Sequence, residues 1–244
     1  IKPRVVINLV KQGNEHAAKE YSDMTKELGY SSYLRYYIEG YPNSDQILSP
    51  QGYGRDEYVE IDSDIVIVTG AASNSGKMST CLGQIYKDSV QGITAGYAKY
   101  ETFPIWNLPL EHPVNLAYEA ATADIGDFNL MDNYHFDAYQ VDSVNYNRDV
   151  EAFKIVIEAA QKIDGMPTYK SPTDMGINMA GKAITNDELV AVAATREIDR
   201  RIGWYREVIE NGNGSEEWIR KCEVLKQRAE SFLESRGYNP TLSI

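Results

Sequence analysis

The sequence predicts an α/β fold, with a parallel Rossmann-like sheet layer, an irregular insert and a C-terminal helical subdomain. Two short apolar runs, Val5–Val10 and Asp64–Thr69, are typical of buried strands, and each precedes a segment with helical spacing. Residues 96–149 are dense in Pro, Asn and Tyr, and regular periodicity is weak there except near Asn115–Ala123. From Asp149 onward, apolar residues recur at helical spacing.

The first predicted unit is a β-α-β unit between residues 5 and 38. The strand Val5–Val10 is followed by a helix that ends near Gly29, and Ser32–Ile38 is extended. Four apolar residues share one face of that helix: Ala17, Tyr21, Met24 and Leu28. Parallel pairing with a right-handed crossover is the default for such a unit.

The second predicted unit is a P-loop-like strand-loop-helix. The strand Asp64–Thr69 leads into a loop of small residues at Gly70–Lys77, and Met78–Tyr86 has helical spacing. Small residues let backbone N–H groups surround a phosphate, the helix N-terminus attracts its charge, and a lysine reaches the outer oxygens. Ligands of such sheets bind beyond the carboxyl ends of the strands.

This loop departs from the pattern G-x-x-x-x-G-K-[ST] at two positions, Ala71 and Met78. We predict that the phosphate is bound by four residues: Gly70, Ser75, Gly76 and Lys77. Ser79 or Thr80 would then supply the hydroxyl that binds magnesium. The alternative is a small-residue turn in which Lys77 is solvated.

The insert supplies the candidate catalytic residues. Long irregular stretches in compact domains are usually functional or disordered, and this one is too aromatic for disorder. Lys99 and Arg148 could meet anionic groups. Glu101 and Asp124 could bind a cation or act as bases. The alternative is a loop that is stabilised by its own side chains.

The C-terminal part predicts a helical hairpin. Thr185–Glu188 has the spacing of a capping box and opens a helix to about Glu210. A glycine-rich turn separates it from a second helix at Ser215–Ser235. We therefore predict two domains, an α/β domain at 1–148 and a helical subdomain at 149–244, and the hairpin could pair two copies of the chain.

Composition narrows the classes of partner. The formal net charge of -12 argues against nucleic acid or an anionic membrane as partner. The apolar runs are too short to span a bilayer. Two cysteines and three histidines share no ligand spacing, so we expect no metal-binding cluster of protein side chains and a cytoplasmic location. Because the chain opens at Ile1, we expect a fragment of a longer protein.

Several motifs together resemble those of one mostly bacterial family. They are Gly40–Pro42, Tyr97–Pro109, His112–Asp124, Asn145–Asp149 and Ser171–Gly176. The family is the domain of unknown function numbered eighteen-forty-six, also called uncharacterised protein family three-seventy-one. The likeness extends from Val5 to Glu210.

The resemblance implies a longer parent protein of which this chain is the central portion, with an additional N-terminal segment and a C-terminal α/β domain. The family's loop reads Pro-Gly-x-Gly-Ser-Gly-Lys, and Asn74 stands where the family has glycine. The resemblance implies no particular reaction, because no reaction is established for the family.

These observations predict a nucleotide- or phosphometabolite-binding enzyme of the phosphoryl-transfer or ligase type. It would be a transferase, ligase or hydrolase that uses ATP or another phosphorylated ligand with magnesium. The expected partners are that phosphorylated small molecule and a second copy of the chain. The alternative is a non-catalytic ligand-binding or homo-oligomerisation module.

Overall fold

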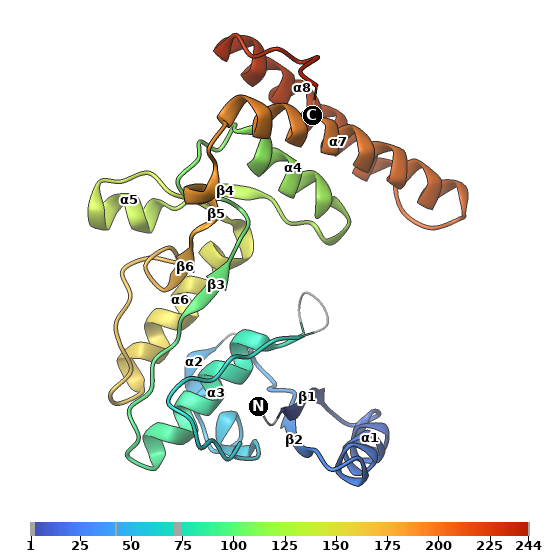
Figure 1. Cartoon of the computed structure of the whole chain (residues 1–244). Coiled ribbons are helices and arrows are strands. Elements are labelled where there is room, and N and C mark those ends of the chain that lie inside the picture. The colour runs from blue at the N-terminus through green and yellow to red at the C-terminus, as the bar shows by residue number, and fades with distance from the viewer. Residues whose placement is uncertain (1–2, 42, 71–74, 244) are drawn as a thin grey trace. The chain divides into compact units, whose positions relative to one another are not determined.

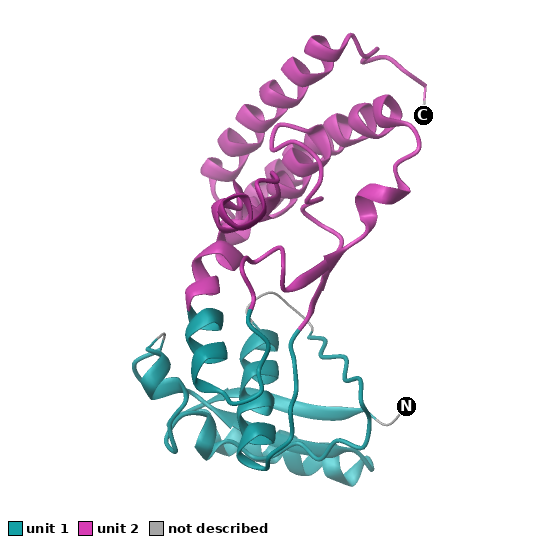
Figure 2. Ribbon diagram, turned by 90° about the vertical axis from the view of Figure 1, so that its left-hand side faces the viewer, with its two compact units in different colours: residues 1–97, 155–168 teal, residues 98–154, 169–244 magenta. Residues whose placement is uncertain are grey.

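The computed structural model describes residues 3–41, 43–70 and 75–243, which form two compact units. Unit 1 comprises residues 1–97 and 155–168, and unit 2 comprises residues 98–154 and 169–244 (Figure 2). The domain boundary that we expected between residues 148 and 149 stays a prediction. Helix α6 (Asn147–Lys162) begins in unit 2 and ends in unit 1.

Unit 1 begins with the predicted β-α-β unit. Its α-helices and strands outside α6, in the described residues, are β1 (Arg4–Val10), α1 (Glu15–Glu27), β2 (Ser31–Tyr36), α2 (Ser44–Ile47) and α3 (Lys77–Val90) (Figure 1). Strands β1 and β2 pair in parallel, with Val5 opposite Ser32 and Ile7 opposite Leu34. The parallel β-α-β prediction is confirmed.

The predicted strand at Asp64–Thr69 is wrong. The described residues of this segment contain no strand, and the Ile65 and Ile67 side chains are 80% and 87% exposed. An apolar run shows that a segment could be buried in a sheet, but it does not supply the neighbouring strand that a ladder requires. In the described residues, β1 and β2 form a sheet of two strands, smaller than the predicted layer.

Helix α3 packs against a buried ion pair in unit 1. Arg35 Nη1 lies 3.2 Å from Asp56 Oδ2, and both side chains are 3% exposed. Burial lowers the pKa of Arg35 and raises that of Asp56. Gly83 leaves room for this pair, because a Cβ there would lie 2.0 Å from Arg35 Nη1 and 3.0 Å from Tyr53 Cδ1.

Unit 2 contains two small sheets and a group of helices. Apart from α6, its α-helices and strands in the described residues are β3 (Lys99–Glu101), α4 (Pro113–Ala121), β4 (Asn129–Met131), α5 (Asn133–Tyr139), β5 (Val144–Tyr146), β6 (Gly176–Asn178), α7 (Asp187–Glu210) and α8 (Glu216–Arg236). Strands β3 and β6 are parallel, and β4 and β5 are antiparallel. The chain is therefore a mixed α/β protein, as expected, with helices dominating its C-terminal part.

The core of unit 2 lies between α4, α7 and α8. Its fully buried side chains include Leu116 of α4, Ile198 and Tyr205 of α7, and Leu225 of α8. The predicted helical hairpin is confirmed, although its first helix is capped one residue later than the capping box implied. Asn186 is the N-cap, and its Oδ1 accepts a hydrogen bond from the Leu189 amide at 3.0 Å.

None of the helices in the described ranges is both long enough and apolar enough to cross a lipid bilayer.

Replacement of Gly83 by alanine tests the packing around the buried ion pair. Alanine gains about 1 kcal/mol of helix propensity, whereas disrupting a buried pair costs about 3–5 kcal/mol. We expect Gly83→Ala to lower the free energy of unfolding by about 2–4 kcal/mol, the net of these effects, in urea titrations.

Gly203→Ala is the matched control, because Gly203 is also inside a helix and a Cβ there meets nothing within 4 Å. The free energy of unfolding of Gly203→Ala should rise by about 1 kcal/mol, because alanine has the higher helix propensity. If both variants gained stability alike, the close approach of Gly83 to Arg35 would be refuted.

Candidate functional site

In unit 1, the ends of the predicted phosphate-binding loop lie close together. Ala71–Asn74 lie outside the described residues, so the following geometry concerns Gly70 and Ser75–Lys77. A Cβ at Gly70 would lie 2.3 Å from Ser75 Oγ. Gly76 is the N-cap of α3 with a left-handed backbone (φ 85°), a conformation that glycine adopts without strain. The backbone therefore favours glycine at position 76, and at position 70 a Cβ would collide with the Ser75 side chain.

Asn8 of β1 anchors this loop to the sheet. Its Nδ2 donates to the Ser75 carbonyl at 2.9 Å, and its Oδ1 accepts from Thr80 Oγ1 at 3.2 Å. Ser79 Oγ donates to the Tyr53 hydroxyl at 3.3 Å. The two hydroxyls expected to bind magnesium are thus hydrogen-bonded to protein groups, and their role in magnesium binding stays a prediction.

Lys77 lies at the first position of α3, and its Nζ donates to Ser75 Oγ at 3.4 Å. The N-terminus of a helix carries a partial positive charge and unpaired amide donors. A lysine at that position adds a full positive charge. Phosphate binding by this arrangement stays a prediction.

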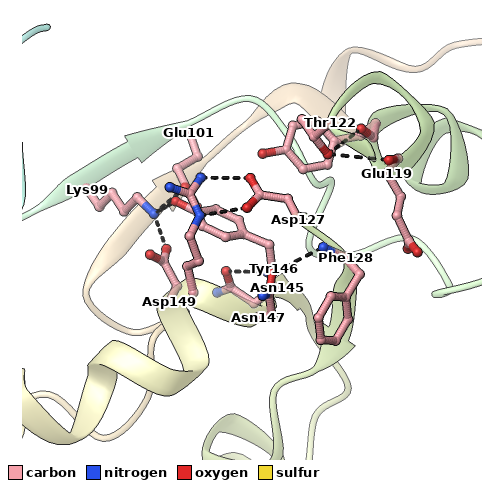
Figure 3. A network of polar contacts seen from close by, with 12 residues as sticks. Lys99, Glu101, Glu119, Thr122, Asp127, Phe128, Asn145, Tyr146, Asn147 and Asp149 are labelled. Carbon is pink, nitrogen blue, oxygen red and sulfur yellow. Dashed lines mark hydrogen bonds and ion pairs between the residues drawn. The ribbon is translucent and has the colours of Figure 1, made fainter. Parts of the chain in front are cut away.

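In unit 2, a network of charged side chains surrounds Lys99. Lys99 and Glu101 are two residues apart on β3, so they share one face of the strand. Lys99 Nζ lies 2.6 Å from Glu101 Oε1, and it also bonds to the Asp149 carboxylate and the Tyr146 hydroxyl (Figure 3). Tyr146 is the last residue of β5, and Asp149 lies in the first turn of α6. We call Lys99, Glu101, Tyr146 and Asp149 the Lys99 cluster.

Burial changes the proton affinity of this cluster. The Glu101 side chain is 7% exposed, and its burial raises the pKa of the carboxyl. The charge of Lys99 opposes this shift, and that of Asp149 adds to it. Burial is the main cause that raises the pKa of Tyr146 far above its ordinary value, and the negative charges of Asp149 and Glu101 raise it further. Tyr146 therefore keeps its proton at neutral pH, and Glu101 binds one more readily than an exposed glutamate.

A second ion pair borders the Lys99 cluster. Arg148 Nη2 and Nε lie 2.7 Å from the two carboxylate oxygens of Asp127, and Asp127 is almost fully buried. The Arg148 guanidinium lies 5.4 Å from the centre of the Tyr146 ring, and Lys99 Nζ lies 4.1 Å from it. Two cations thus meet three carboxylates at this site.

Three of the four predicted catalytic residues are brought together here: Lys99, Glu101 and Arg148. The fourth, Asp124, accepts a hydrogen bond from the Tyr205 hydroxyl of α7 at 3.3 Å. In the part of the chain that the structure describes, no group of three or more His, Cys, Asp or Glu side chains is positioned to hold a metal ion.

Sequence reasoning missed Tyr146, Asp149 and Asp127 as members of this site. The run Asn145–Asp149 had drawn attention as a motif, but nothing in it specified contact with Lys99, which lies 50 residues from Asp149. Asn8 was missed for the same reason, because it lies 67 residues from Ser75. The spacing of Lys99 and Glu101 was the usable signal, since residues two apart on a strand share a face.

The Lys99 cluster is chemically suited to proton transfer. A buried carboxyl with a raised pKa is a better base near neutral pH than an exposed one, and a neighbouring hydroxyl can relay the proton. Lys99 compensates the negative charge that appears when Glu101 is ionised.

The family model described as "Domain of unknown function DUF1846, N-terminal" matches residues 2–230. The chain is also 44% identical over 220 residues to "UPF0371 protein" of Streptococcus pneumoniae (strain CGSP14) and to that of Streptococcus thermophilus (strain ATCC BAA-491 / LMD-9). Each match covers 89% of this chain and 44% of the relative, so the chain spans less than half the length of these relatives.

Replacement of Glu101 by glutamine tests the raised pKa. A carboxyl whose pKa is raised by folding favours the folded state below its unfolded pKa, and this contribution is lost as the pH rises through the folded pKa. The stability of Glu101→Gln relative to the parent should therefore increase as the pH rises above 4.5, the ordinary pKa of a glutamate, in urea unfolding.

Glu111→Gln is the control, because the pKa of Glu111 is shifted in the opposite direction to that of Glu101. The hydrogen bond from Arg228 lowers the pKa of Glu111, so its contribution is lost only below the ordinary value of 4.5. The stability of this variant relative to the parent should stay constant over the same pH interval. A Glu101→Gln difference that stayed equally constant would contradict the raised pKa.

Proposed function

The chain belongs to the family of Domain of unknown function DUF1846, and we propose that it is a nucleotide- or phosphometabolite-binding enzyme of the phosphoryl-transfer or ligase class. In this proposal, the Lys99 cluster transfers a proton and the N-terminus of α3 binds a phosphate. The two parts of the proposal rest on different units, and each is tested by itself.

The observation that carries the proposal is the bonding of one ammonium group to Glu101, Asp149 and the Tyr146 hydroxyl. Removing each charge from water costs several kcal/mol, so such a group is an expensive way to stabilise a fold. Strongly perturbed, partly buried titratable groups are concentrated at catalytic sites. The cluster is therefore the best-supported catalytic candidate among the described residues.

Each side chain has a chemical role in the proposed reaction. During phosphoryl transfer, the acceptor oxygen bonds to phosphorus while the bond from phosphorus to the leaving oxygen of the donor breaks, and the acceptor hydroxyl loses its proton. Glu101 would take that proton, either directly or through Tyr146. Lys99 would hold Glu101 and Asp149 in position and balance their charge, and Arg148 would face an anionic group of the second substrate.

Unit 1 would hold a phosphate site of its own, proposed independently of the Lys99 cluster of unit 2. The amides at the start of α3 and the charge of Lys77 would bind the phosphate of ATP or of another phosphorylated small molecule. Ser79 or Thr80 could bind the accompanying magnesium only after leaving its hydrogen bond to Tyr53 or Asn8. Asp124 would contribute a carboxylate to a magnesium site only if it left Tyr205.

The alternative is a non-catalytic ligand-binding or homo-oligomerisation module. The exposed apolar face of α1, described below, is the observation in its favour. Turnover of a phosphorylated compound by the chain would exclude this alternative.

Titration calorimetry of the chain with ATP, GTP and inorganic phosphate, with and without magnesium, tests the phosphate site. Charge-assisted hydrogen bonds contribute about 1.5–3 kcal/mol, so Lys77→Ala should weaken binding by about 10- to 100-fold. Lys26→Ala, on the exposed end of α1, is the matched control and should bind like the parent. Equal affinity of Lys77→Ala and the parent would remove Lys77 from the site.

Phosphorus NMR of a mixture of phosphorylated metabolites and hydroxyl acceptors tests the Lys99 cluster. Loss of a proton-transfer group reduces rates by about 10²- to 10⁴-fold, so Tyr146→Phe should slow whatever conversion the parent performs by that factor. Tyr100→Phe, on the same part of the chain but 74% exposed, should keep the parent's rate. Full activity of Tyr146→Phe would refute its role as a relay.

A further inference from the structure

Helix α1 turns its large apolar face away from unit 1. Its buried residues are small or polar: Ala18, Ser22 and Thr25. The helix packs on the β1–β2 sheet through this narrow face. A surface helix of a globular protein normally buries the face that carries its large apolar residues.

Large side chains recur on the exposed face of α1 and just after its end. Tyr21 is 57% exposed, Met24 is 55% exposed and Leu28, the C-cap residue, is 74% exposed. Together with Ala17, they follow a spacing of four, three and four residues, the pattern with which one helix packs against another apolar element. We call these four residues the α1 stripe.

We infer that the α1 stripe is the docking surface for the part of the family's chain that lies outside the matched segment. The streptococcal relatives match this chain over 44% of their length, so more than half of each relative lies elsewhere. An apolar stripe at helix-packing spacing fits an apolar face of that additional part, most simply an amphipathic helix or a sheet face.

A second copy of the chain is a poorer occupant of this surface. Each partner in a stable complex of separate molecules buries roughly 800 Å², more than a few side chains can provide. The net charge of -12 also opposes the approach of two copies. A segment of the same polypeptide needs far less contact area, because the linkage gives it a high effective concentration.

Thiol labelling tests this inference in two proteins: this chain alone, and a chimera of "UPF0371 protein" of Streptococcus pneumoniae (strain CGSP14) in which the matched part of this chain replaces the corresponding segment. Met24→Cys reports on the α1 stripe. Asp23→Cys is the matched control, because Asp23 is adjacent in sequence, exposed and outside both the stripe and the buried face. Parent proteins measure the background from Cys81 and Cys222.

We expect maleimide labelling of Met24→Cys to be at least about tenfold slower in the chimera than in the chain alone, with Asp23→Cys unchanged. Equal labelling of Met24→Cys in both proteins would overturn the inference. Protection that appeared in the chain alone and grew with its concentration would identify a second copy as the occupant, and would also overturn it.

Hydrogen exchange of the natural pneumococcal protein provides a measurement that does not depend on folding of the chimera. Amides of the helix aligned with α1 should exchange more slowly in the full-length protein than in its isolated matched segment. The same exchange rate in both would overturn the inference.

Discussion

The bonding of Lys99 to Glu101, Asp149 and Tyr146 is the interaction on which the arrangement of the candidate site depends. These residues come from β3, from the end of β5 and from the first turn of α6, so one ammonium group links three elements of unit 2. The same group sets the electrostatics, because burial favours protonation of Glu101 whereas Lys99 favours its ionised form. A site balanced in this way can exchange a proton at little cost.

Local patterns predicted the elements, whereas contacts between distant residues could not be read from them. The run Val5–Val10 and the helical spacing after Lys77 correspond to β1 and α3. Lys99 and Glu101 could be paired because residues two apart on a strand share a face. Asp127 was missed, since nothing near Arg148 in the sequence identifies a partner 21 residues away. Periodicity describes a residue's neighbours along the chain, but not its partners across the fold.

An apolar pattern also does not identify what covers the apolar segment. This limit applies both to the wrongly predicted strand at Asp64–Thr69 and to the α1 stripe. Ile65 and Ile67 are exposed in a segment without strand pairing, and Met24 is exposed on a helix whose buried residues are small. In each case the sequence correctly identified an apolar segment. It did not identify what covers that segment, because hydrophobicity is non-directional and specifies no partner.

The stability of a charge-free Lys99 cluster tests most directly whether the cluster is a catalytic site or a structural support. Lys99→Met, Glu101→Gln and Asp149→Asn would be combined in one variant, and its unfolding in urea compared with that of the parent at neutral pH. Replacing a whole buried ion network is often neutral or stabilising by about 1–4 kcal/mol, and catalytic sites commonly sacrifice stability for function. We therefore expect the triple variant to be at least as stable as the parent. A loss of more than about 3 kcal/mol would contradict this account and would make the cluster a structural element of unit 2.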